Sequence, residues 1–138
     1  MATPVDNGRS QAAYRPGITG GAVSAPVKPV VSFDTLAALD IRIGTILAIE
    51  DVATSRKLAR LRVSFGDHER VVLAGLKAER TDLQALVGRQ TVFVVNLEPR
   101  RMAGEVSEGM LFDIGYADGI VPVLAVPEAP VPDGTRLG

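Results

Sequence analysis

The sequence predicts an all-β domain into which one helix is inserted. Alternating or β-branched apolar runs recur from residue 41 onward, as half-buried strands require. A single helical pattern, residues 79–87 closed by Gly88, lies between the third and fourth of these runs. A doubly wound α/β fold needs several helices, and a β-sandwich has no helix inserted between its strands. The single helical pattern therefore favours neither of these folds.

Each expected element has a local signature. Residues 33–39 suit a short helix with Asp34 or Thr35 as its N-cap. Strands are expected at 41–52, 59–65, 70–76, 89–97, 110–116 and 120–126. The charged, Gly-containing segment 98–109 is expected to be a loop, and the Pro-rich segment 127–138 to be extended.

Five strands with a helix between the third and fourth is the layout of the OB-fold, a partly open Greek-key barrel. We therefore expect a five-stranded OB-fold barrel over residues 33–138, with a short N-terminal helix and a C-terminal strand extension. Residues 1–32 hold four of the nine prolines and are expected to be a flexible Gly/Pro-rich tail. Its apolar end, 26–33, is either a docking arm or part of that flexible leader.

Composition excludes several kinds of site. The chain has no Cys, which excludes disulfides, thiolate nucleophiles and Cys-ligated zinc, and the single histidine, His68, excludes a multi-His metal site. We find no nucleophile elbow or phosphate-binding loop motif. No apolar run approaches the roughly 18 residues of a membrane span. We expect no catalytic residue, no metal, no cofactor and no membrane insertion.

Charge is distributed unevenly, although the formal net charge is −1. Residues 42–101 carry 11 basic and 7 acidic side chains, whereas residues 102–138 carry 1 basic and 6 acidic. A basic middle segment is able to form a face that binds anionic nucleic acid. The alternative is an ordinary mixed surface, in which exposed ion pairs contribute only about 0–1 kcal/mol each.

Several ordered segments resemble those of one family, the stand-alone tRNA-binding domain. The resembling segments are 40–44 (DIRIG), 55–58 (SRKL), 61–63 (LRV), 86–89 (LVGR), 94–101 (VVNLEPRR) and 104–110 (GEVSEGM). The family includes CsaA-type export chaperones and domains appended to methionyl-tRNA synthetase. The resemblance covers about residues 33–138, and it implies an OB-fold, a tRNA ligand, no catalysis, a homodimer and a cytoplasmic location.

The resemblance and the expected loop positions nominate one RNA-binding face. Its candidates are Arg42, Lys57, Arg60, Arg62, Arg100, Arg101, Ser107, Glu108 and Met110. Cations neutralise phosphates, and OB-folds bind ligands with the loops where Lys57 and the Arg100–Arg101 pair are expected. Segment 107–110 either contacts a nucleotide or is a tight turn into the core. Because Phe65 and Phe93 are expected in the core, recognition of RNA shape fits better than base stacking.

Two residues depart from the pattern of the resembling family. Ala74 stands where a serine is usual, and Glu98 where a lysine is usual. The first removes a hydroxyl donor, and the second places a negative charge beside the expected phosphate path. These departures support a second hypothesis, a CsaA-like export chaperone that binds extended polypeptide in a dimer groove, and a third, a scaffold that has lost its ligand. The dimer is expected to use residues 33–39 and the Pro-rich end.

Overall fold

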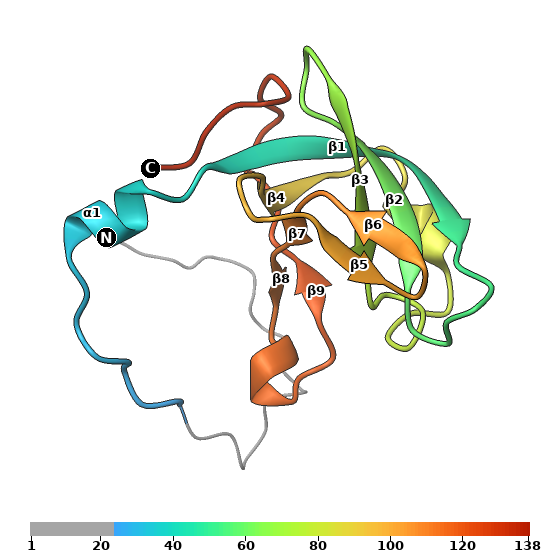
Figure 1. The fold of residues 1–138 in the computed structure, drawn as a ribbon, viewed down its shortest axis with the longest axis horizontal. Helices are drawn as coiled ribbons and strands as arrows, with labels where there is room; N and C mark the ends of the chain where they lie inside the picture. The colour runs from blue at the N-terminus through green and yellow to red at the C-terminus, as the bar shows by residue number, and fades with distance from the viewer. Residues whose placement is uncertain (1–23) are drawn as a thin grey trace.

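Five strands form one antiparallel sheet that curls into a nearly closed barrel (Figure 1). The computed structural model describes residues 24–138, so most of the expected Gly/Pro-rich tail at 1–32 lies outside the described residues. The strands are β1 (Ile41–Asp51), β2 (Ala59–Ser64), β3 (Glu69–Ala74), β4 (Gln90–Val94) and β7 (Met110–Leu111). Their order in the sheet is β3-β2-β1-β4-β7. The predicted all-β, OB-fold architecture is confirmed.

The alternation in β2 separates core from surface as the sequence predicts. Leu61 and Val63 are fully buried, whereas Arg60 and Arg62 point outward on the other face. Inside the barrel, the rings of Phe65 and Phe93 meet edge to face with their centroids 5.5 Å apart. Both phenylalanines therefore belong to the core, as expected.

Ser107 and Glu108 complete the barrel where β3 and β7 do not pair directly, through side-chain and backbone hydrogen bonds. The Ser107 hydroxyl accepts a hydrogen bond from the backbone N–H of Leu73 at 3.0 Å. The Glu108 N–H donates to the carbonyl of Val71 at 2.8 Å, and the Val71 N–H donates in return to Glu108 Oε1 at 2.9 Å. These bonds satisfy edge groups of β3 that would otherwise lack partners.

The helices are shorter than expected. Between β3 and β4 stands only a 3-10 helix, η2 (Leu83–Leu86), because the N–H of Gly88 already bonds the carbonyl of Ile46 at 2.7 Å and draws the chain into the sheet. The first helix, α1 (Phe33–Ala37), is capped by Ser32, whose hydroxyl accepts from the N–H of Thr35, so the expected Asp34 or Thr35 cap is wrong. No helix in residues 24–138 is long and apolar enough to cross a membrane.

The segment expected to be a loop at 98–109 contains a β-hairpin. Its strands are β5 (Arg100–Met102) and β6 (Glu105–Ser107). Ala103 and Gly104 join them with φ values of 50° and 81°, the two positive angles of a type I′ turn. The sequence gives little sign of this hairpin, because Ala at the first turn position is a weak signal for left-handed backbone. After β7 the expected strands are also shorter, as β8 (Asp113–Ile114), 3-10 helix η3 (Tyr116–Asp118) and β9 (Val123–Leu124).

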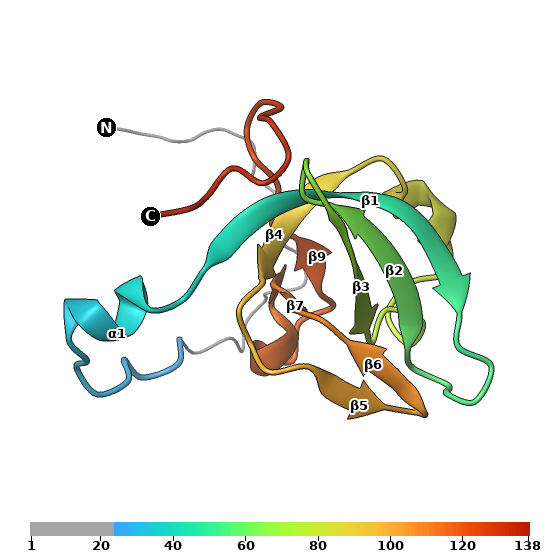
Figure 2. The same cartoon turned by 45° about the horizontal axis from the view of Figure 1, so that its top comes forward.

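The C-terminal segment lies along the start of β1, close to α1 (Figure 2). The N–H of Ile43 donates to the carbonyl of Thr135, and the N–H of Leu137 donates to the carbonyl of Ile41, each at 2.9 Å. The isolated bridge between Arg42 and Arg136 agrees with the extended conformation expected for 127–138, whereas the strand extension expected at 120–126 is found as β9. In contrast, the described part of the arm extends away from the barrel, with Val27 97% and Val30 98% exposed.

Candidate nucleic-acid interface

The loop between β1 and β2 displays two cations, Arg56 and Lys57, and both are exposed. The hydroxyl of Ser55 accepts hydrogen bonds from the N–H groups of Lys57 at 3.2 Å and Leu58 at 3.0 Å. This local turn directs the loop back into β2. Neither cationic side chain forms a hydrogen bond or ion pair with another residue in 24–138. The loop therefore presents two available positive charges.

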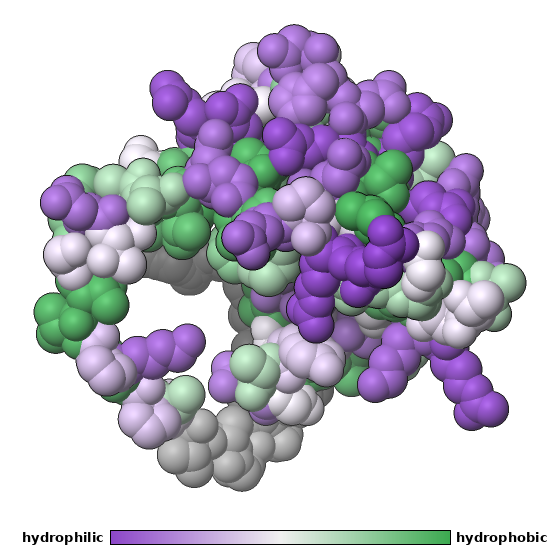
Figure 3. All heavy atoms as spheres, in the orientation of Figure 1, coloured by the Kyte–Doolittle hydropathy of each residue, from purple (hydrophilic) through white to green (hydrophobic). Residues whose placement is uncertain are grey.

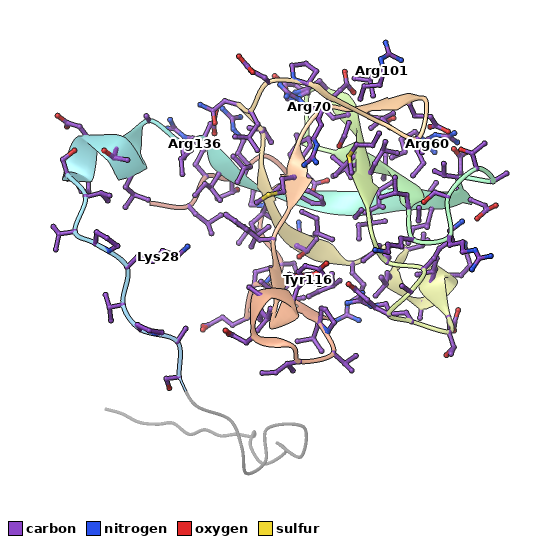
Figure 4. All side chains as sticks on the ribbon, turned by 60° about the horizontal axis from the view of Figure 1, so that its bottom comes forward. Lys28, Arg60, Arg70, Arg101, Tyr116 and Arg136 are labelled. Atoms are coloured by element: carbon purple, nitrogen blue, oxygen red, sulfur yellow. The ribbon has the colours of Figure 1, made fainter. Side chains whose placement is uncertain are left out.

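The β5–β6 hairpin presents Arg100 and Arg101 on opposite faces. Arg100 is paired across the hairpin with Ser107, whose side chain is buried against β3, so both belong to the face turned toward the barrel. Arg101 is paired with the half-exposed Val106 on the other face. Figure 4 shows Arg101 pointing away from the barrel. Both guanidinium groups are exposed and without a side-chain partner among the described residues.

The loop and the hairpin touch each other. The hydroxyl of Thr54 in the β1–β2 loop donates to the carbonyl of Ala103 at the tip of the hairpin, at 3.2 Å. These segments occupy the positions of the two OB-fold loops that commonly bind ligands. The contact thus joins two segments that carry exposed cations, Arg56 and Lys57 on the loop and Arg100 and Arg101 on the hairpin, and we call these four residues the loop–hairpin surface.

Arg60 fastens the hairpin to the barrel. Its Nε and Nη2 donate to the two carboxylate oxygens of Glu105 at 2.7 and 2.5 Å, and its Nη1 donates to Glu50 at 2.8 Å. The hydrogen bond from Arg60 is the main reason that the pKa of Glu105 is lowered. Two carboxylates neutralise this arginine. Its role in the structure is therefore to hold the hairpin, and it is poorly suited to bind a phosphate.

Arg42 and Arg62 also have acidic partners, but they differ in availability. Arg42 makes a two-pronged contact with Asp40, at 2.8 and 3.0 Å, and this hydrogen bonding lowers the pKa of Asp40. Arg62 has a single contact, from Nη1 to Glu69 at 3.0 Å, and both side chains are about half exposed. An exposed single contact of this kind is easily exchanged for another anion. Arg62 thus remains available, and Arg42 is largely committed to Asp40.

The candidates at 107–110 also differ in whether their side chains are free to contact a ligand. Ser107 is 3% exposed, and its hydroxyl also donates to the carbonyl of Gly109 at 2.9 Å, so its polar groups are used inside the barrel. Glu108 is exposed but its carboxylate is bonded to β3. Met110 lies on β7 and is 41% exposed. A side chain on Gly109 would come within 3.0 Å of the carbonyl of Val94, which explains the glycine by close backbone approach.

Two basic residues outside the nominated set have clear roles. Arg56 belongs to the loop–hairpin surface, and its adjacency to Lys57 in the sequence was the signal that could have identified it. Arg70 donates from Nη1 to the carbonyls of Val95 at 2.6 Å and Glu108 at 3.2 Å, across the open end of the barrel. No local pattern predicts this contact, because the acceptors lie 25 and 38 residues away. Residues 24–138 hold no cluster of three or more potential metal ligands.

A second surface, at the opposite side from the hairpin, is apolar. Hydrophilic side chains gather over the barrel, whereas hydrophobic ones are exposed at α1 (Figure 3). Phe33, Leu36 and Leu39 are exposed there, beside Leu137 of the C-terminal segment, and a cleft lies between the two segments. Asn96 holds α1 in place, since its amide donates to the carbonyl of Ala38 and accepts from the N–H of Asp40, both at 2.8 Å.

Comparison with known proteins agrees with this geometry. A family model described as "Putative tRNA binding domain" matches residues 41–136. A methionine–tRNA ligase from Cytophaga hutchinsonii is 41% identical over 113 residues, which are 82% of this chain and 16% of that protein. The chain therefore spans about one sixth of the length of that relative.

Two solved structures share the fold. A MetRS-related protein from Pyrococcus horikoshii superimposes with a TM-score of 0.74 at 27% identity, covering 80% of this chain and 100% of that one. The chaperone CsaA from Bacillus anthracis superimposes with a TM-score of 0.69 at 31% identity, with the same coverage.

Proposed function

The chain belongs to the tRNA-binding domain family, and from this we propose that it is a non-catalytic protein that binds tRNA through phosphate and ribose contacts. The observation that carries the proposal is the loop–hairpin surface. Its two touching segments carry four cations without acidic partners among the described residues, although the chain as a whole is slightly acidic. Such a cluster attracts the RNA backbone by neutralising phosphates and releasing bound counterions. A tRNA ligand also favours a cytoplasmic location.

The aromatic residues support recognition of shape over stacking. Phe65 and Phe93 are buried in the barrel, so neither offers a platform for a base. The half-exposed Met110 is the one nominated side chain able to make a soft apolar contact with a base. We therefore propose that contacts with the phosphates and riboses of the RNA dominate. Lys57, Arg100 and Arg101 would be the principal cations, and Arg56 and Arg62 would add further phosphate contacts.

The test is binding of fluorescent bulk tRNA to the full chain, measured by anisotropy at two salt concentrations. We expect micromolar or tighter binding that weakens steeply with salt, and each lost phosphate contact flattens the salt slope by roughly 0.7–0.9. Lys57→Ala and Arg100→Ala should each show this change. Arg89→Ala is the matched control, because Arg89 is an exposed cation preceding β4 and outside the loop–hairpin surface. Absence of binding at low salt, or unchanged affinity in both variants, would refute the proposal.

We propose that the protein acts as a homodimer joined through α1 and the C-terminal segment. The exposed apolar side chains of Phe33, Leu36, Leu39 and Leu137 support this, since a patch of this kind on a small domain marks an association surface. Leu36→Asp should convert a dimer to a monomer in sedimentation velocity, with unchanged far-UV circular dichroism. A wild-type chain that sediments as a monomer at micromolar concentration would exclude the dimer.

A second candidate function is that of a CsaA-like chaperone for unfolded or export-bound polypeptide. Two observations favour it: the 31% identity to a CsaA chaperone and the exposed apolar cleft beside α1. Apolar peptide binding should change little between low and high salt, whereas RNA binding should fall steeply. Competition between bulk tRNA and an extended apolar peptide at both salt concentrations separates the two functions.

A further inference from the structure

Lys77, which follows β3, uses its whole ammonium group inside the protein. Its Nζ donates to Asp51 Oδ1 at 2.5 Å, to the carbonyl of Val52 at 3.0 Å and to the carbonyl of Ser55 at 2.6 Å. An ammonium group has three N–H donors, and these three acceptors occupy all of them. The side chain is only 21% exposed. Lys77 is therefore a cation that has no donor left for a phosphate.

All of these contacts converge on the β1–β2 loop. The backbone N–H of Lys77 adds a fourth, to the carbonyl of Lys57 at 3.0 Å. Lys77 thus holds the loop at its beginning, at Asp51 and Val52, and again on both sides of Arg56. The only residue between the anchored carbonyls of Ser55 and Lys57 is Arg56 itself. Such anchoring fixes the direction in which the two exposed cations leave the backbone.

We propose that Lys77 is a positioning residue for RNA binding, which orders the loop that presents Arg56 and Lys57 without contacting RNA itself. This inference rests on the proposed tRNA-binding function. A loop ordered before binding avoids the entropy loss that a mobile loop suffers when it closes on its ligand. Without the ammonium group, three oxygens lose their donor, and the loop keeps the Ser55 turn, the Thr54 contact with the hairpin and the backbone bond from residue 77 to the Lys57 carbonyl.

Limited trypsin digestion of the full chain tests the ordering step without RNA. Trypsin cleaves after Arg and Lys, so Arg56 and Lys57 report on the loop. Lys77→Met retains the aliphatic stem, and we expect about tenfold faster cleavage at the loop. Charged hydrogen bonds of this kind reduce the population of the locally open loop by roughly that factor. Arg89→Met, the matched control, should digest at the wild-type rate. Should Lys77→Met fail to fold by circular dichroism, Asp51→Ala removes one acceptor of the ammonium group and should accelerate the same cleavage by a smaller factor.

A double-mutant cycle with bulk tRNA tests the consequence for binding. Lys77→Met should weaken binding roughly tenfold in the wild-type chain and cause no further loss in an Arg56→Ala/Lys57→Ala background. Additive losses would mean that Lys77 touches RNA directly, and they would overturn the inference. So would unchanged loop cleavage, or faster cleavage with unchanged affinity. A wild-type chain that does not bind tRNA overturns the proposed function and the RNA role of Lys77 together, while the digestion still shows whether Lys77 orders the loop.

Discussion

Replacing Ser107 by Ala should destabilise the barrel where it closes. The hydroxyl of Ser107 accepts from the N–H of Leu73 and donates to the carbonyl of Gly109, and both Ser107 and Leu73 are buried. Alanine leaves the buried N–H of Leu73 without a partner, which costs about 1–3 kcal/mol. The cavity left by one oxygen atom adds little. We therefore expect the free energy of unfolding to fall by about 2 kcal/mol.

The assay is urea unfolding followed by far-UV circular dichroism, since the chain has no Trp. With an m-value of about 2 kcal/mol/M, the midpoint should fall by roughly 1 M at an unchanged m-value. Ser64→Ala is the control, because Ser64 accepts from the exposed N–H of Gly66, and it should change the stability by less than about 0.5 kcal/mol. Equal midpoints for Ser107→Ala and the wild type would refute the assignment of this hydroxyl to barrel closure. Lower tRNA affinity with unchanged stability would instead support a direct RNA contact.

Three further changes have outcomes set by the structure. Gly44→Ala places a Cβ 2.7 Å from Val63 Cγ1 and 2.8 Å from Phe65 Cε1, both in the packed core, and should lower the free energy of unfolding by about 1–3 kcal/mol in urea titrations. Burial raises the pKa of Glu79. The charged carboxylate therefore destabilises the folded state once the pH rises above the usual pKa of a glutamate. The stability of Glu79→Gln relative to wild type should therefore increase between pH 4 and pH 7, and a pH-independent difference would contradict this. Ala103→Asn should raise the thermal midpoint, because Asn suits the left-handed backbone of the type I′ turn better and recovers up to about 1 kcal/mol.

The nominated cations divide by what neutralises them. Arg60 and Arg62 occupy equivalent outward positions on β2, and the alternation of the strand treats them alike. In the folded chain Arg60 is held by Glu50 and Glu105, whereas Arg62 has one exposed contact with Glu69. Glu105 lies 45 residues from Arg60, so no local pattern predicts the pair. The alternation of the strand predicts which arginines face outward, but it could not separate available cations from those already bound to carboxylates.

The elements that the sequence predicted well are those with a local cause. Alternation at 59–65, the turn after it and the apolar run before Asn96 follow from the two-residue period of strands. The helix at 79–87 was overestimated because a tertiary bond, from Gly88 to Ile46, ends it after one turn. The β5–β6 hairpin was missed because its turn begins with Ala103, a residue that favours other conformations.

By itself, the sequence determined the all-β class, the order of the elements, the buried face of each long strand and the family. These depend on residue periodicity and on motifs that stand together in the chain. Only the tertiary structure decided that the β1–β2 loop and the β5–β6 hairpin touch and that Lys77 and Arg60 hold these two cation-bearing segments. It also decided that the Ser107 hydroxyl is used to close the barrel. The physical reason is that hydrogen bonds and ion pairs depend on distance in space, and strand pairing sets that distance for residues far apart in the chain.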